Sequence, residues 1–178
     1  LRTFVDSLGT NLDARRLQRP DDPRRDLSAR PSQMKLSAED LLLGKILKGL
    51  PGSQDLVLGP GDDCAVVRTK GGLHLLKTDC VVEGVHFLRE QDPVRVGWKA
   101  LCRPLSDIAA MGGEPLHALI TLVSPPGLDP AYWVGFYKGI RKAARKFHVT
   151  IAGGEMSRQP RGIAVSVALT GSLAGRHV

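Results

Sequence analysis

The chain has 178 residues, enough for one sizeable domain, and its apolar share of 42% and charged share of 24% are ordinary for a globular protein. Only 4% of the residues are aromatic, so nucleic-acid bases would find few stacking platforms despite a formal charge of +7. A basic cluster at residues 138–146 is interpreted as a solvated helix face, so no nucleic acid is expected as a partner. No apolar run is long enough to span a membrane, so no membrane partner is expected either. Three scattered cysteines without a C-x-x-C pair predict free thiols and a cytoplasmic location.

Residues 1–35 mix Arg, Asp and Pro with few apolar side chains, so we expect a poorly ordered extension there and a folded domain over 36–178. Ser37 and Asp40 have capping-box spacing at the start of a leucine-rich helix. Gly49 and the residues after it end that helix. The chain stops five residues after its last expected strand, which favours an amino-terminal fragment of a longer protein.

The remaining elements follow from apolar runs and punctuating residues. Asp92 and Asp129 each precede a proline and so predict helix starts, while Pro104 predicts a kink inside the first of these two helices. The expected strands cover 55–58, 64–68, 73–78, 116–123, 149–152 and 163–173, and the expected helices cover 93–111 and 130–148. This order predicts an α/β (α+β) fold, with a mixed sheet and helices packed on one face.

Four short acidic segments stand at the edges of these apolar runs: 61–63, 78–79, 106–107 and 153–155. A carboxylate in such a place loses hydration unless it gains a cation or hydrogen-bond donors. If the segments converge, a divalent metal is an economical way to hold them, and hard oxygen ligands favour Mg²⁺, which also binds phosphate. The sequence therefore predicts a Mg²⁺–phosphate site.

Each segment also has a plain structural interpretation. Asp62 and Asp63 follow Gly and Pro, so a polar turn is the favoured interpretation when this segment is taken alone. His86 lies between apolar residues, where a histidine is more often structural than functional. Asp107 is the sharpest case, because Asp is a poor residue for a small, apolar helical segment and is rarely buried unpaired.

The last acidic segment combines several possible phosphate and metal contacts. Gly153 and Gly154 could open backbone N–H groups towards phosphate, Glu155 could complete a metal site, and Arg158 could pair with an anion. The chain lacks the phosphate loop and the dinucleotide fingerprint, and it offers no nucleophilic triad, so no catalytic side chain is predicted.

Read in order, these segments resemble the thiamine-monophosphate kinase family, within the wider group of aminoimidazole ribonucleotide synthetase, selenophosphate synthetase and a hydrogenase maturation factor. The most specific matches are Glu-Gly-Val-His-Phe at 83–87 and Ser-Asp-Ile-Ala-Ala-Met-Gly at 106–112. The other matching stretches are 61–67, 78–82, 99–101 and 153–155. The resemblance covers roughly residues 36–178, the amino-terminal domain of a two-domain family.

The resemblance implies ATP-dependent phosphorylation of thiamine monophosphate to thiamine diphosphate with Mg²⁺, in a homodimer whose amino-terminal domains pair through their strands. It implies a substrate-facing role for His86 and nucleotide contacts at Gly154 and Glu155. Arg158 is a further possible contact. The metal ligands that it implies are Asp63, Thr78, Asp79, Asp107 and Glu155, with Asp62 nearby.

The chain departs from the family pattern at Glu155 and at Lys77, the residue before Thr78. Lys77 stands where the family has a small hydroxyl residue, and it could offset a metal charge or spoil that metal site. Glu155 stands where the family has Asp, which would shift a tightly octahedral Mg²⁺. Two alternatives therefore stay open: an inactive dimerising remnant, and a related ATP-dependent synthetase with another substrate.

Overall fold

The structure is a computed structural model that describes residues 37–173, which divide into two parts. The first part contains helix α2 (Ala38–Ile46), and it confirms the predicted capping box. The Ser37 amide donates to Asp40 Oδ2 at 2.8 Å, and the Asp40 amide donates to Ser37 Oγ at 3.0 Å. The predicted extension over 1–35 lies outside the described residues.

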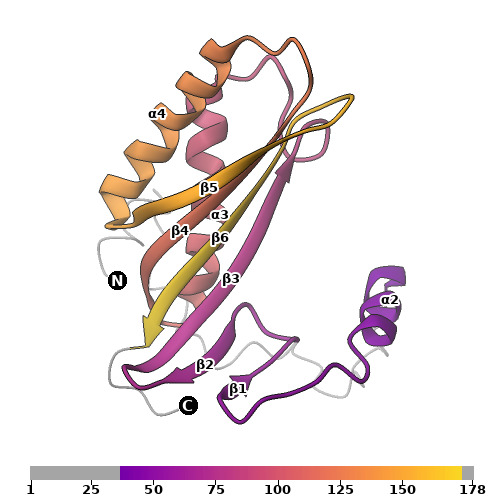
Figure 1. The fold of residues 1–178 in the computed structure, drawn as a ribbon, viewed down its shortest axis with the longest axis vertical. Helices are drawn as coiled ribbons and strands as arrows, with labels where there is room; N and C mark the ends of the chain where they lie inside the picture. Colours follow the sequence, from indigo (N-terminus) through magenta and orange to yellow (C-terminus); the bar gives the residue numbers. More distant parts are fainter. Residues whose placement is uncertain (1–36, 174–178) are drawn as a thin grey trace, which may run out of the picture. The chain divides into compact units, whose positions relative to one another are not determined.

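The second part begins at Gly49 and carries a six-stranded mixed sheet. Its strands are β1 (Leu56–Leu58), β2 (Ala65–Thr69), β3 (Gly72–Val82), β4 (Glu114–Ser124), β5 (Thr150–Arg158) and β6 (Ala164–Leu173). They lie in the order β1-β2-β3-β6-β4-β5, and only the β4–β5 pair is parallel. Figure 1 shows β6, the last strand in sequence, between β3 and β4.

Two predicted strand ends are wrong. Strand β3 runs to Val82, so Thr78 and Asp79 lie inside a strand and not at its end, because the whole strand pairs in register with β6. Strand β5 continues through the two glycines to Arg158, because it pairs with β4 over this length. A side chain at Gly154 would place its Cβ 1.9 Å from the Ile120 carbonyl oxygen, so glycine permits this close strand pairing.

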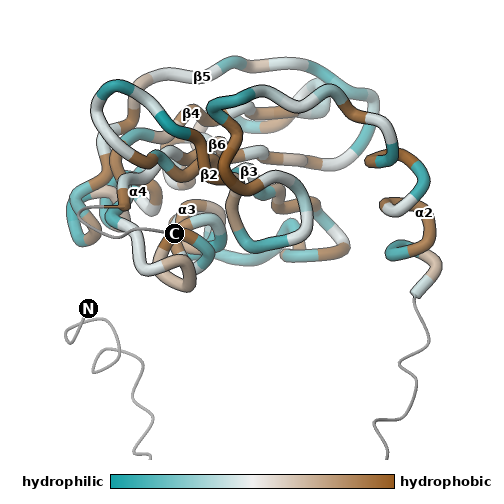
Figure 2. The backbone as a smooth tube through the Cα atoms, turned by 90° about the horizontal axis from the view of Figure 1, so that it is seen from below, coloured by the Kyte–Doolittle hydropathy of each residue, from teal (hydrophilic) through white to brown (hydrophobic). Residues whose placement is uncertain are grey.

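Helices α3 (Pro93–Ala110) and α4 (Pro130–Phe147) begin at the predicted caps, where the Asp92 and Asp129 side chains accept from backbone amides. Helix α3 runs through Pro104 as one element. It contacts β3, β4 and β6, and α4 packs against α3. Figure 2 shows both helices on the same side of the sheet, so the predicted fold class is confirmed.

Two glycines let α3 and α4 approach each other closely. A Cβ at Gly97 would lie 2.0 Å from the Phe136 carbonyl oxygen, and one at Gly139 would lie 1.9 Å from the Val94 carbonyl oxygen. The buried residues Leu101, Ile108, Phe136 and Ile140 fill the space between the helices and the sheet, together with Leu75, Val81, Ile120, Val165, Val167 and Leu169 from the strands.

Strand β3 shows how the sheet divides its residues between two faces. Leu75 and Val81 are buried on the face covered by α3, whereas Leu76 and Cys80 are exposed on the opposite face. Within residues 49–173 no helix covers that opposite face, which we call the open face.

The basic cluster at 138–146 lies on α4, as predicted. Two of its side chains have an intramolecular contact, because the ammonium groups of Lys142 and Lys146 lie 5.8 and 5.7 Å from the Trp98 ring centroid. Among the described residues, no helix is both long and apolar enough to cross a membrane.

Candidate functional site

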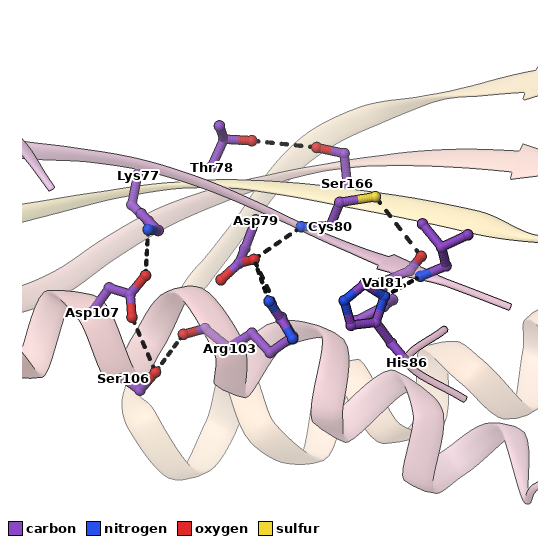
Figure 3. Close-up of polar contacts among 11 residues, drawn as sticks. Lys77, Thr78, Asp79, Cys80, Val81, His86, Arg103, Ser106, Asp107 and Ser166 are labelled. Carbon is purple, nitrogen blue, oxygen red and sulfur yellow. Dashed lines mark hydrogen bonds and ion pairs between the residues drawn. The ribbon is translucent and has the colours of Figure 1, made fainter. Parts of the chain in front are cut away.

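Two ion pairs connect β3 to α3 on the helix-covered face of the sheet. Lys77 pairs with Asp107, and Asp79 pairs with Arg103 at 3.0 Å. Lys77 and Asp79 are two residues apart on a strand, and Arg103 and Asp107 are four apart on a helix, so each pair of positions shares one face. Figure 3 shows the two contacts side by side between strand and helix.

Each element contributes one cation and one carboxylate to this arrangement, so the four formal charges cancel. Asp79 Oδ1 accepts from Arg103 Nη2 at 3.0 Å, from Arg103 Nε at 3.2 Å and from the Cys80 amide at 3.1 Å. Asp107 Oδ2 contacts Lys77, and Oδ1 accepts from Ser106 Oγ at 3.3 Å. The side chains of Lys77, Asp79 and Asp107 are 22%, 17% and 23% exposed, whereas that of Arg103 is 38% exposed, so the two carboxylates are more shielded from solvent than the guanidinium.

The acidic loop between β1 and β2 lies within electrostatic reach of these pairs. Burial raises the pKa of the Cys64 thiol to about 11; Lys77 lowers that pKa, while Asp107, Asp63 and Asp62 raise it. Three segments that are far apart in sequence therefore place charges around one buried thiol. The metal site predicted for the loop and Asp107 stays a prediction.

Lys77 is held as a cation by its surroundings. Partial burial lowers its pKa, but the hydrogen bond and charge of Asp107 and the charge of Asp79 outweigh burial and raise the pKa above the usual lysine value. Lys77 therefore stays charged at neutral pH and keeps its pairing with Asp107.

His86 lies in the loop that follows β3. Its Nδ1 accepts from the Val82 amide at 3.0 Å, so this nitrogen carries no proton and Nε2 is the ring's donor. The Lys99 ammonium donates to the His86 carbonyl oxygen and holds the loop to α3.

Glu83 fixes the same loop from the other side. Its carboxylate accepts from Arg89 Nε at 2.9 Å, from Arg89 Nη2 at 2.5 Å and from the Ile163 amide at 2.8 Å. The Glu83 amide donates to the Ile163 carbonyl oxygen at 2.9 Å. Glu83 therefore ties the His86 loop to the start of β6, and its role is structural.

Other predicted site residues lie away from the two ion pairs. Thr78 Oγ1 lies 3.3 Å from Ser166 Oγ on the open face, opposite Asp79 (Figure 3). Glu155 pairs in register with Thr121 of β4 and accepts from Ser157 Oγ, while Arg158 is exposed at the end of β5. No three His, Cys, Asp or Glu side chains of the described residues come close enough together to hold a metal ion.

The donor sets differ in how well they fit Mg²⁺. Asp62 and Asp63 are exposed hard-oxygen donors on one loop, where the Asp63 amide donates to Asp62 Oδ1 at 2.8 Å, and neither has an ion pair with another described residue. They fit a partly hydrated Mg²⁺ that also binds phosphate. Asp79 and Asp107 do not fit it in this arrangement, because a guanidinium and an ammonium already neutralise them.

Two arginines of this region were missed by sequence reasoning. Arg103 lies four residues before Asp107, and that spacing places both on one face of a helix, so the contact with β3 could have been inferred. Arg89 gave no comparable signal, because the turn after β3 sets its distance from Glu83.

Residues 61–173 match the model of the AIR synthase related protein, N-terminal domain, and this range includes the acidic loop, both ion pairs and His86. The chain belongs to this family. The resemblance drawn from the acidic segments is confirmed.

The chain is also similar to thiamine-monophosphate kinases. It is 42% identical to that of Aquifex aeolicus over 111 residues, which cover 62% of this chain and 36% of that kinase. It is 33% identical to that of Escherichia coli K12 over 114 residues, which cover 64% of this chain and 35% of that kinase. The chain thus spans little more than a third of the length of these relatives.

Solved structures agree with this assignment. A structure of AaThiL complexed with AMPPCP and TMP is 38% identical, with a TM-score of 0.64, and the match covers 75% of this chain and 40% of that one. The thiamine monophosphate kinase of Aquifex aeolicus, in another crystal structure, is 33% identical, with a TM-score of 0.62 and coverage of 79% and 43%. A HypE–HypF complex has the same fold, with a TM-score of 0.57 at 19% identity.

Proposed function

We propose that this chain supplies the amino-terminal half of a thiamine-monophosphate kinase, which transfers phosphate from ATP to thiamine monophosphate and forms thiamine diphosphate. The observation that carries the proposal is the 38% identity to AaThiL, a protein solved with AMPPCP and TMP. The kinases named above support the same activity.

In this proposal the acidic loop receives the nucleotide. Asp62 and Asp63 would hold Mg²⁺ together with the phosphate oxygens of ATP, and the metal supplies charge neutralisation for phosphoryl transfer. The loop is suited to this because both carboxylates are exposed and neither is held by a cation among the described residues. The proposed contributions of Thr78, Gly154, Glu155 and Arg158 to the nucleotide and metal sites stay predictions.

His86 is the proposed contact for the substrate phosphate. Its ring is oriented by the Val82 amide, which binds Nδ1 and leaves Nε2–H free to donate to an anionic oxygen. Glu83 and Lys99 hold the loop that carries it. Orientation of the acceptor phosphate, rather than a covalent intermediate, is the chemistry that these residues can provide.

We also propose that two copies pair through the open face. This face carries Leu76 and Leu119, which are 43% and 52% exposed, and a groove of about 390 Å³ lies between them and Ala168. Contiguous exposed apolar surface of this kind is typical of an interaction site. Three free cysteines support a cytoplasmic location for the dimer.

Calorimetric titration of the chain with ATP, with and without Mg²⁺, tests the nucleotide site. We expect binding that requires Mg²⁺ and weakens by about tenfold or more in Asp63→Asn, because that substitution removes a charged ligand of the metal. Glu90→Gln, which neutralises an exposed carboxylate on another loop, should bind as the wild type does. Binding that is unaffected by Mg²⁺ or by Asp63→Asn would contradict the proposed nucleotide site.

The two alternatives predict different results. An inactive dimerising remnant would self-associate and show no Mg²⁺-dependent ATP binding. A related synthetase would bind ATP but form no thiamine diphosphate from thiamine monophosphate once the rest of the kinase is supplied. Formation of thiamine diphosphate by the completed protein would exclude both.

A further inference from the structure

The two ion pairs between β3 and α3 occupy the carboxylates that would otherwise be the best-shielded metal ligands of the site. Asp79 and Asp107 are only 17% and 23% exposed, yet neither requires an added cation, because Arg103 and Lys77 come from the same two elements. The arrangement is electrically neutral and self-contained (Figure 3).

We propose that Lys77 is a built-in counter-cation that keeps divalent metal ions away from Asp107, with Arg103 doing the same at Asp79. On this basis the chain restricts divalent cations to the exposed Asp62–Asp63 loop, where they arrive with the nucleotide. The proposal deepens the proposed nucleotide function. Its central claim, that an ammonium prevents metal binding at Asp107, can be tested without ATP.

The physical argument rests on ligand supply and charge. Mg²⁺ requires near-octahedral oxygen coordination, but one oxygen of Asp107 contacts Lys77, and the other lies 3.3 Å from Ser106 Oγ, whose hydroxyl also donates to the Arg103 carbonyl oxygen at 2.6 Å. Asp79 Oδ1 already accepts three hydrogen bonds. A divalent ion at Asp107 would have to displace Lys77 or add two positive charges to a neutral, partly shielded cluster, and both are unfavourable.

Lys77 is the residue that decides this, because its ammonium is a flexible point charge on a strand that faces α3. Removing it leaves Asp107 with one neutral hydrogen-bond donor, Ser106, and no countercharge. A divalent cation is then the available replacement. Asp79 lies two residues further along the same face of β3. It could supply a second oxygen ligand to that cation if the Arg103 side chain moves away.

The test measures Mn²⁺ binding to the whole chain in the absence of nucleotide. Mn²⁺ replaces Mg²⁺ because it shares the preference for oxygen ligands, and electron paramagnetic resonance measures the concentration of free Mn²⁺. We expect Lys77→Ser to gain a site that binds Mn²⁺ about tenfold or more tightly than the wild-type chain does. The gain should disappear in Lys77→Ser combined with Asp107→Asn. Lys70→Ser, which removes an exposed lysine from the β2–β3 turn, should leave Mn²⁺ binding unchanged.

Two results would overturn the proposal. If the wild-type chain binds Mn²⁺ and loses that binding in Asp107→Asn, Lys77 moves aside and does not exclude the metal. If Lys77→Ser gains no site while far-ultraviolet circular dichroism shows it folded, Lys77 is not what prevents binding. Lys77→Gln, which keeps most of the side-chain volume, replaces Lys77→Ser should the shorter residue fail to fold. Neither result bears on ATP binding at the acidic loop, so failure here is distinguishable from failure of the proposed function.

Discussion

The two faces of the sheet use the same strands in opposite ways. On the helix-covered face, β3 presents buried Leu75 and Val81 together with Lys77 and Asp79, and each of the two charged side chains has a partner on α3. On the open face the same strand presents Leu76, which is 43% exposed and has no helix from residues 49–173 above it.

This contrast separates a face whose side chains have partners within the chain from a face that leaves apolar side chains exposed to solvent. The helix-covered face fulfils its own packing and charge requirements, so substitutions there should act on stability. The open face keeps apolar surface in water, so substitutions there should act on association and leave the fold intact.

Gly139→Ala should produce the largest effect, because it adds a methyl group where α3 and α4 pack closely together. The added Cβ would lie 1.9 Å from the Val94 carbonyl oxygen and 2.8 Å from the Trp98 amide nitrogen, so α3 and α4 must separate. We expect a loss of about 2–3 kcal/mol in the free energy of unfolding, even though alanine is the better helix former. Chemical denaturation measures it.

Gly44→Ala is the matched control, since a Cβ in that helix would have no atom within 4 Å. It should be neutral or slightly stabilising. An equally small effect of Gly139→Ala would mean that the two helices do not pack through this contact.

Cys80, on the open face, should be alkylated about 100-fold or more faster than the buried or partly buried Cys64 and Cys102. Burial raises the pKa of Cys64 and of Cys102 to about 11, so at pH 8 about one molecule in a thousand carries either thiolate. Cys80 is exposed on the open face. In the dissociated chain, alkylation by iodoacetamide with peptide mass spectrometry should label Cys80 first, and all three thiols should react similarly in denaturant.

Rapid labelling of Cys64 in the native chain would show that the acidic loop opens. That outcome would remove the shielding on which the helix-covered face depends. Rapid labelling of Cys102 would indicate instead that α3 separates from its neighbours.

Leu119→Lys should weaken self-association by about tenfold or more, because it puts a hydrated charge in the middle of the open face. Leu119 is already 52% exposed in the single chain, so the thermal midpoint of the monomer should hardly change. Sedimentation velocity over a concentration series measures the dissociation constant. Val134→Lys, on an α4 position that is 56% exposed, is the control for added charge. A wild-type chain that stays monomeric, or equal effects of both variants, would rule out pairing through this face.

Much of this division could be predicted from the sequence, because local signals decide it. The capping residues Ser37, Asp92 and Asp129 set the helix starts, and all three predictions are confirmed. The apolar runs located every strand of the sheet. The acidic segments led to the family that the comparisons confirm.

The rest depended on contacts between distant segments. Val81 and Val82 favour a strand after Asp79, but the hydrogen bonds that extend β3 to Val82 come from β6, which is distant in sequence. Gly154 carried a phosphate-binding prediction because a Gly-Gly pair can open backbone N–H groups towards phosphate, but the approach of Ile120 determines its place in a strand. The pairing of Lys77 with Asp107 required the angle between a strand and a helix, which no sequence spacing provides.

The smallest expected effect concerns the contacts of Glu83 with Arg89 and with the Ile163 amide. The Arg89 guanidinium, by hydrogen bond and charge, and the Ile163 amide hold the pKa of Glu83 below its usual value of 4.5, against partial burial. A carboxylate whose pKa is lower in the folded chain stabilises it above the unfolded pKa, and this stabilisation is lost as pH falls through the folded pKa. Glu83→Gln should therefore be less stable than the wild type at pH 7 by no more than about 1 kcal/mol, since the pair is partly exposed. The gap should close below pH 4, and thermal unfolding from pH 7 to pH 3 measures it. Glu90→Gln, which changes an exposed neighbouring carboxylate, should have the stability of the wild type at every pH. If Glu83→Gln is still less stable than the wild type at pH 3, then packing and hydrogen bonding, and not the charge of Glu83, account for its contribution.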